Sequence, residues 1–245
     1  MGAMLQSPLF GHGRMAACQH DAAAIEARDL VNRVDTNRLR EALEQLPPAV
    51  LDRLGALFER IDAAYAQTAD QCGFVCRGCD ESCCRTRFYH YTLLEMAYLK
   101  EGLAVLSATE RDEVVLRARA QIDQMRRCQR AGKPPRAMCP LNVAGRCRLY
   151  AQRPMICRLH GVAHRLRRGD GIFQQAPGCH RFAQQCPESG QSLLDRTPHY
   201  QQMAVLEQSL RRGLNFEGRI KFTVAEMVLM LCGDAADDIP THENH

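Results

Sequence analysis

The sequence contains no apolar run long enough to cross a lipid bilayer. A spanning helix needs about 20 mainly apolar residues, whereas the longest apolar stretch, residues 222–232, is shorter and contains Glu226. Residues 1–24 also lack the basic start and the apolar run that are typical of a secretory signal. We therefore expect a chain that has no membrane segment and stays in the cytoplasm.

Several functional motifs are missing as well. The sequence has no GxxxxGK(S/T) loop and no GxGxxG loop after a strand, which argues against nucleotide binding through these motifs. No repeat of solenoid period is present. Asp80 and Glu81 lie within the densest cysteine run, where carboxylates usually face solvent or bond to the local backbone. No pair of nucleophile and base is recognisable, so the sequence predicts no catalytic residue.

Lysine is scarce, with 3 residues against 29 arginines. The formal net charge is +4 and many arginines flank the cysteines, but a cysteine binds metal as a thiolate. Two sites of four thiolates and one divalent ion would offset this whole charge. We therefore interpret the arginines as charge compensation and as hydrogen-bond donors to sulfur. Because no basic strand interleaved with aromatic residues is evident, nucleic-acid binding is not favoured.

Cysteine, by contrast, is abundant, with 13 residues. Clustered thiols form disulfides in exported proteins, whereas in a reducing compartment they more often bind metal or do redox work. Since we expect a cytoplasmic protein, we predict metal binding and not a disulfide scaffold. Five thiols are interpreted as packed or spare: Cys18, Cys72, Cys128, Cys186 and Cys232. Among them, Cys72 is the best candidate for an additional ligand.

The first group of predicted ligands is the run CRGCDESCC. It contains Cys76, Cys79, Cys83 and Cys84. The C-x2-C pair lets a tight turn direct two sulfur atoms at one ion, and no βαβ pattern supports a thioredoxin-like redox pair. Neighbouring residues of an extended chain point in opposite directions. Cys83 and Cys84 are therefore expected to serve two different centres, unless only one of them is a ligand.

The second group is spread over a longer stretch. It contains Cys139, Cys147, Cys157 and Cys179. Gly145 is suited to the turn before Cys147, and Arg153-Pro154 redirects the chain so that Cys157 can return to the same place. A metal that joins both groups would close the long interval between them, which converts binding energy into folding energy. We expect the metal-free chain to be at least partly unfolded.

Together these motifs resemble the YkgJ-type cysteine-cluster family, described as a zinc- or iron-chelating domain. The resemblance covers roughly residues 72–180. It includes the C-x2-C-x3-CC run, the helix start Thr92-Leu93-Leu94-Glu95, Cys139-Pro140-Leu141, Gly145 with Cys147, Leu149-Tyr150, Arg153-Pro154 and Cys157-Arg158. The chain departs from the family at residues 80–82, where Gly is usual, and at Leu141, where Phe is usual. The resemblance implies metal chelation with Cys179, or Cys186 in its place, as the eighth ligand.

The ligand set leaves two cofactors open. All-thiolate donors suit both zinc and iron–sulfur clusters. Zinc sites usually combine compact cysteine pairs at regular spacing, whereas here one compact run precedes unevenly spaced cysteines, which favours an iron–sulfur cluster over zinc. Three histidines would replace a thiol only in a Cys3His site and are interpreted as neighbours of the site or as surface residues: His160, His164 and His180.

Helical segments are predicted on both sides of the cysteines. Asp35 or Thr36 is expected to cap a helix that ends at Pro47-Pro48, and an amphipathic helix follows over residues 50–65. Later helices are expected to start at Thr92, Ser107, Thr197 and Thr223. The fold class is mainly α, with cysteine metal-binding segments on loops. The expected divisions are an N-terminal helical extension (1–70), a cysteine-cluster metal-binding domain (71–187) and C-terminal helices packing on the same core (188–245).

Three functions are consistent with these features. The favoured one is a cytoplasmic metal-binding protein that chelates iron, as an iron–sulfur cluster, or zinc, for storage, delivery or sensing. The second is an iron–sulfur enzyme such as a protein lysine N-methylase-like methyltransferase, because the flagellin lysine N-methylases are similar in holding iron and sulfur with clustered thiols. The third is a zinc-stapled module whose arginines bind RNA or an acidic protein partner.

Overall fold

The computed structural model describes residues 35–77, 83–134, 136–186 and 193–232. Within them the fold is mainly helical, with eight α-helices and two small sheets, which confirms the predicted fold class. No helix in these ranges has the length and apolar character of a membrane span.

The first two helices begin as their sequence predicts. Asp35 caps α2 (Thr36–Glu44), and its carboxylate accepts hydrogen bonds from the backbone N–H groups of Asn37 and Arg38. Pro47 separates this helix from α3 (Pro48–Asp70). The apolar stripe of α3 is buried, as predicted, through Leu54, Leu57, Phe58 and Ile61.

Hydroxyl caps also open the next helices. The Thr92 hydroxyl accepts a hydrogen bond from the Glu95 N–H at the start of α4 (Leu93–Ala104). Ser107 and Glu110 form a complete capping box at the start of α5 (Ala108–Arg130). Both helix starts are confirmed. They could be predicted because the capping residues lie within four consecutive residues of the sequence.

The C-terminal helices follow the same rules. Thr197-Pro198 opens α8 (Thr197–Gly213). Thr223 and Glu226 bond reciprocally before α9 (Val224–Cys232), since each backbone N–H donates to the other side chain. Both starts were predicted.

Short elements lie between α3 and α8 and were not predicted. They are the 3₁₀-helix η1 (Cys83–Arg85), β1 (Asn142–Val143), β2 (Arg146–Cys147), α6 (Met155–Leu159), β3 (His164–Arg167), β4 (Phe173–Ala176), α7 (His180–Gln185) and β5 (Leu194–Asp195). Strands β1 and β2 form an antiparallel hairpin. Strand β3 pairs antiparallel with β4 and parallel with β5. These elements carry most of the described candidate ligands.

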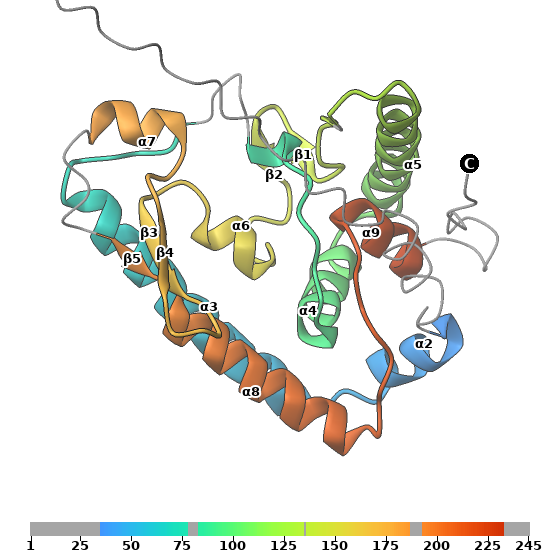
Figure 1. The fold of residues 1–245 in the computed structure, drawn as a ribbon. Coiled ribbons are helices and arrows are strands. Elements are labelled where there is room, and N and C mark those ends of the chain that lie inside the picture. The colour runs from blue at the N-terminus through green and yellow to red at the C-terminus, as the bar shows by residue number, and fades with distance from the viewer. Residues whose placement is uncertain (1–34, 78–82, 135, 187–192, 233–245) are drawn as a thin grey trace, which may run out of the picture. The chain divides into compact units, whose positions relative to one another are not determined.

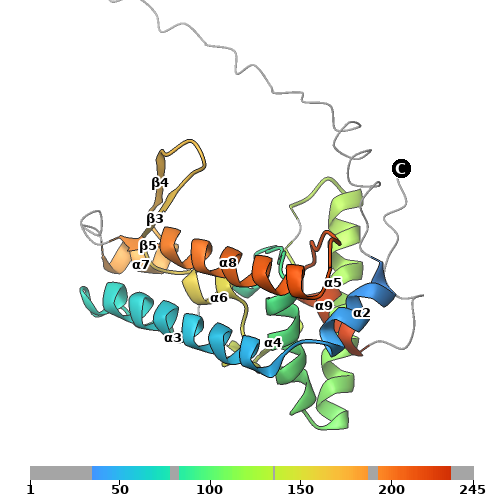
Figure 2. The same ribbon diagram turned by 90° about the horizontal axis from the view of Figure 1, so that it is seen from below.

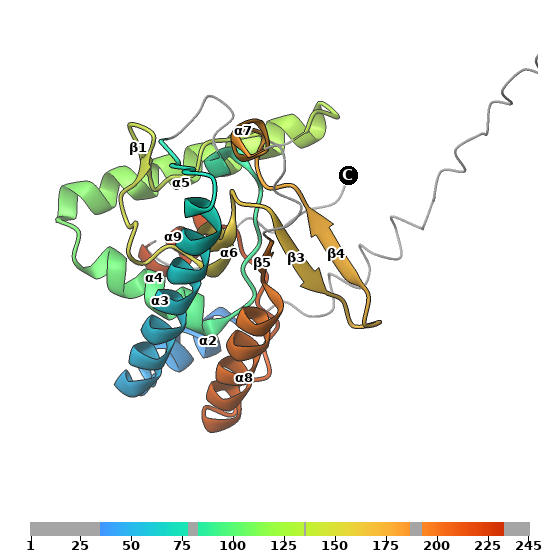
Figure 3. The ribbon, with the colours of Figure 1, turned by 90° about the vertical axis from the view of Figure 1, so that its left-hand side faces the viewer.

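One hydrophobic core joins the helices. Helix α3 packs against α8, α6 and α4, and α5 packs against α9. Figure 1 and Figure 2 show α3 and α8 side by side, and Figure 3 shows α6 next to them. The buried cluster includes Leu57, Leu159 and Met203, one from each predicted division of the chain. The division into three parts remains a prediction.

Candidate metal centre

Four predicted ligands gather in what we call the inner thiol group. They are Cys84, Cys139, Cys147 and Cys157, and all are half-buried. Burial raises the pKa of the Cys139 thiol to about 12, and the nearby thiols of Cys84 and Cys147 add to the shift. Burial and the same neighbours, together with Cys139, raise the pKa of Cys157. The inner group therefore brings together sulfurs from four separate segments.

Backbone contacts explain how the chain brings these segments together. The Cys139 N–H donates to the carbonyl of Cys84 at 2.8 Å, which joins the two cysteine groups directly. Ala144 and Gly145 both have positive φ, 50° and 84°, as a tight two-residue hairpin turn requires. The hairpin places Cys147 opposite Asn142, close to Cys139. The predicted turn at Gly145 is confirmed.

Cys157 is positioned by the anchoring of α6 on α3. Arg158 is only 4% exposed, and its Nη1 donates to Asp62 Oδ2 at 2.5 Å. Its guanidinium also lies over the Phe58 ring, 4.2 Å from the centroid. Arg153, before α6, donates to the other Asp62 oxygen at 2.9 Å. Asp62 and its arginine partners were not identified from the sequence, because their pairing spans more than 90 residues.

Three further predicted ligands form the outer thiol group, defined as Cys76, Cys83 and Cys179. The first two are exposed and the third is half-buried. The group surrounds Tyr65 on α3, whose pKa is raised first by burial and then by these thiols. Cys79 lies outside the described residues, between Cys76 and Cys83.

Glycines allow the close approach of Cys179 to this group. The Cys179 N–H donates to the carbonyl of Gly161 at 2.8 Å. A Cβ on Gly161 would lie 2.7 Å from the Tyr65 hydroxyl, and a Cβ on Gly178 would lie 2.5 Å from the Gly161 oxygen. Both have positive φ. Side chains at these positions would therefore separate Cys179 from Tyr65.

The junction between the groups differs from the prediction in one respect. Cys83 and Cys84 do not lie in extended chain, because Cys83–Arg85 is a 3₁₀-helix. A hydrogen bond between the two thiols is the main cause of the raised pKa of Cys83. Cys83 lies near Cys157 of the inner group as well as Cys76 of the outer group, whereas Cys84 lies near Cys139 and Cys147. The adjacent cysteines thus stand between the two groups.

Neither group is a finished coordination shell. In the part of the chain that the structure describes, no three His, Cys, Asp or Glu side chains are placed to hold one metal ion. Metal binding would have to draw the sulfurs closer and remove their protons. The thiols of Cys139 and Cys157 are protonated in the metal-free protein, since burial raises their pKa values. Metal binding therefore has to displace these protons.

Cys72 and Cys186 differ from what the sequence led us to expect. Cys72 and Cys186 form a disulfide with a Cα–Cα distance of 5.8 Å. The expectation that these thiols are packed or spare, and that either might replace a ligand, is therefore wrong for this structure. The bond joins the end of α3 to the end of α7. No local pattern indicates this bond, because its partners are 114 residues apart.

Glu95 is a buried carboxylate beside the inner group. Its side chain accepts hydrogen bonds from the Thr92 hydroxyl at 2.8 Å and from the Met155 N–H at 3.1 Å, and lies 3.5 Å from His90 Nδ1. Burial acts to raise the pKa of Glu95, but the hydrogen bonds outweigh burial and lower it. The capping motif predicted its role at α4, whereas no local pattern indicates its second role at α6.

His160 and His164 contact an aromatic ring and the backbone, respectively. His160 packs edge-on against Phe88, with ring centroids 5.4 Å apart, and burial lowers its pKa. His164 Nδ1 donates to the Val162 carbonyl, 3.3 Å away. Their interpretation as neighbours of the site, and not ligands, stays a prediction.

Comparisons with known proteins give no relative. No family model matches the chain, and neither the curated proteins nor the solved structures contain a match.

Proposed function

We propose that the protein binds metal through its two thiol groups. The observation that carries this proposal is the half-buried gathering of Cys84, Cys139, Cys147 and Cys157 from four separate segments. Four thiolates at one place suit an iron–sulfur cluster or zinc. The inner group supplies one such set, and the outer group with Cys79 supplies a second.

The local charge supports thiolate formation at the inner group. Arg153 and Arg158 lie near enough to Cys147 to act against the rise in pKa that burial causes there. Both guanidiniums are held in place by Asp62. Fixed cations beside a thiolate site compensate its negative charge.

The two groups suit different roles in a cytoplasmic protein for metal storage, delivery or sensing. The inner group is half-buried, so a metal there would be retained and would stabilise the fold. Cys76 and Cys83 are exposed. The outer group is therefore the one through which metal is gained or handed on.

Purification without oxygen tests the proposal. Iron, zinc and acid-labile sulfide are measured per chain together with the visible absorption spectrum. Matched iron and sulfide with brown colour would establish iron–sulfur clusters, and colourless protein with stoichiometric zinc would establish zinc sites. Protein that holds no metal after reconstitution with either would overturn the proposal.

Single substitutions then separate the groups. Cys157→Ser should remove the metal of the inner group and Cys179→Ser that of the outer group, each leaving about half of the total. Cys128→Ser is the matched control, because this half-buried thiol lies on α5, outside both groups. Loss of all metal in both variants would instead indicate one shared cluster. Equal metal content in all three variants would rule out the assignment of ligands.

A further inference from the structure

The Cys72–Cys186 disulfide joins the two chain segments that supply Cys76 and Cys179 to the outer thiol group. Cys72 lies just after α3 and four residues before Cys76. Cys186 is the C-cap of α7, and Cys179 is the N-cap of the same helix. Helix α7 therefore has an outer thiol at its start and the disulfide at its end.

Two side chains of α7 also contact the segment that follows α3. Gln185 Nε2 donates to the carbonyls of Cys72 and Gly73 at 3.4 and 2.9 Å, but Gln185 is exposed to solvent. The rings of Phe74 and Phe182 pack edge-on, with centroids 5.1 Å apart. Helix α7 has only six residues, and so short a helix is not stable without its tertiary contacts. The position of α7 therefore depends strongly on the disulfide.

The inner thiol group is held in place by other contacts. The Cys139 N–H donates to the Cys84 carbonyl, and the β1–β2 hairpin positions Cys147. The ion pair of Arg158 with Asp62 positions α6 on α3. None of these contacts involves α7 or the disulfide. Cleavage of the disulfide should therefore change the outer group and leave the inner group intact.

A reductant can reach one sulfur of the bond better than the other. Cys72 is half-buried, whereas Cys186 is only 4% exposed. Because access decides which sulfur a thiolate attacks, Cys72 is the expected point of attack. In the cytoplasm, where we expect this chain, disulfides are rare and are usually transient or redox-sensing. A bond that is reversibly reduced fits this compartment better than a permanent crosslink.

We infer that the Cys72–Cys186 disulfide is a redox switch that controls how firmly the outer group holds metal, an inference that rests on the proposed function. A dithiol reductant supplies the two electrons. One of its thiolates attacks the Cys72 sulfur and expels Cys186 as a thiolate, and its second thiol then displaces Cys72 and closes a disulfide within the reductant. The two protons of the dithiol pass to the two cysteine thiolates. Without the bond, α7 and Cys179 can move away from Cys76, and the outer group releases its metal.

The rate of zinc release from the full chain tests this inference. Zinc-loaded wild type, with the bond verified by mass spectrometry, is compared with the double variant Cys72→Ser with Cys186→Ser. A third sample is wild type reduced by a phosphine that is then removed, and a chromogenic chelator follows release in all three. Release from the outer group should be about 10–100-fold faster without the bond, as for loss of groups that orient metal ligands. Release from the inner group should be unchanged.

The matched control is the double variant Cys128→Ser with Cys232→Ser. It also removes two half-buried thiols, but these lie on α5 and α9, outside both groups. Its zinc release should equal that of the wild type. Alkylation of the metal-free chain gives a second readout, since Cys179 should react faster when the bond is absent and Cys157 should react at the same rate. Circular dichroism shows whether each variant is folded.

Three results would overturn the inference: equal zinc release with and without the bond, equal alkylation of Cys179, or slower release after reduction. Slower release would mean that the freed thiols of Cys72 and Cys186 act as additional ligands. Simultaneous loss of zinc from both groups would also overturn it, because the bond would then stabilise the whole fold and not the outer group. Absence of zinc from the oxidised wild type would overturn the proposed function itself, and the inference with it.

Discussion

Glu95 serves two helices with one carboxylate. It closes the capping motif of α4 through Thr92 and accepts the N–H of Met155 at the start of α6, the helix that carries Cys157. A helix N-terminus favours negative charge, and here two N-termini share it. The buried carboxylate thus connects the core helix α4 with the inner thiol group.

Substitution of Glu95 by Gln should lower the free energy of unfolding by about 1–3 kcal/mol, because an amide cannot accept from all three donors and leaves a buried group unsatisfied. The measurement is urea unfolding followed by circular dichroism. Glu226→Gln is the control, since among the described residues this half-buried carboxylate accepts from its own cap residue Thr223 alone. If Glu95→Gln lowers the free energy of unfolding no more than Glu226→Gln does, the proposal that Glu95 stabilises both α4 and α6 is contradicted.

The pH dependence of the same variant gives a second readout. The pKa of Glu95 is lower in the folded protein than in the unfolded chain, where a glutamate titrates near 4.3. The unfolded state therefore binds more protons at acid pH, and the contribution of Glu95 to stability is present above about pH 4.3 and is lost as the pH falls through the folded pKa. The difference in Tm between wild type and Glu95→Gln should shrink over that window.

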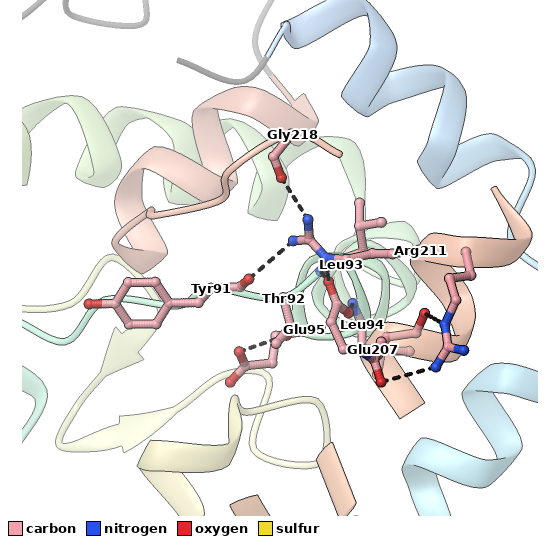
Figure 4. Close-up of polar contacts among 10 residues, drawn as sticks. Tyr91, Thr92, Leu93, Leu94, Glu95, Glu207, Arg211 and Gly218 are labelled. Atoms are coloured by element: carbon pink, nitrogen blue, oxygen red, sulfur yellow. Dashed lines mark hydrogen bonds and ion pairs between the residues drawn. The ribbon is translucent and has the colours of Figure 1, made fainter. Parts of the chain in front are cut away.

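At the scale of elements, distant side chains complete what local caps begin. Glu207 on α8 accepts hydrogen bonds from the N–H groups of Leu93 and Leu94 in the first turn of α4, at 2.9 and 3.2 Å (Figure 4). Arg211 holds this carboxylate through Nε at 2.6 Å and donates from Nη1 to the Gly218 carbonyl at 2.6 Å. Helix α8 therefore caps α4 and fixes the start of the segment that leads to α9.

Replacing Glu207 by Ala should lower the free energy of unfolding by about 1–3 kcal/mol, because two buried N–H groups lose their acceptor. Glu217→Ala is the control, since Glu217 is exposed and just precedes Gly218. Hydrogen exchange provides the local readout. Exchange of the Leu93 and Leu94 amides should accelerate in the variant, and unchanged protection would show that Thr92 caps α4 alone.

The sequence predicted the elements whose signals are local. The caps at Asp35, Thr92 and Ser107 each lie within four residues of the groups that they bond. Glu207 could not be recognised as a cap, since its acceptor role depends on residues 113 and 114 positions away. The β3–β4 hairpin also has a local signal, the turn sequence Gly169-Asp170-Gly171 between its strands.

In the candidate site, too, the features with a local sequence signal were predicted, and those that depend on contacts between distant residues were not. Spacing and residue type selected the eight cysteines, and Gly145 indicated the turn that brings Cys147 close to Cys139. Which thiols meet was not determined by spacing, because α6 and α7 are positioned by contacts with α3 and with Gly161. The expectation that Cys83 and Cys84 serve different centres, unless only one is a ligand, stays a prediction, and the extended chain on which it was based is wrong, because Cys83–Arg85 is a 3₁₀-helix. The family resemblance remains a prediction.

At the scale of the whole molecule, the Cys72–Cys186 disulfide encloses every predicted metal ligand. The eight cysteines lie between residues 76 and 179, inside the loop that the bond closes. A disulfide across a loop of this length stabilises a fold by up to about 4.7 kcal/mol in the chain-entropy model. A metal in the inner group closes much of the same loop, from Cys84 to Cys157. The two crosslinks therefore restrict the same unfolded chain.

Their stabilising effects should accordingly not be additive. The double variant Cys72→Ser with Cys186→Ser should lower Tm more in metal-free protein than in metal-loaded protein, because the bound metal already restricts the unfolded chain. Thermal unfolding gives the four Tm values, those of the wild type and of the double variant, each with and without bound metal. With the disulfide intact, the metal-free chain should keep the core formed by α3, α4 and α8. An equal loss of Tm in both metal states would mean that the bond and the metal constrain separate parts of the chain.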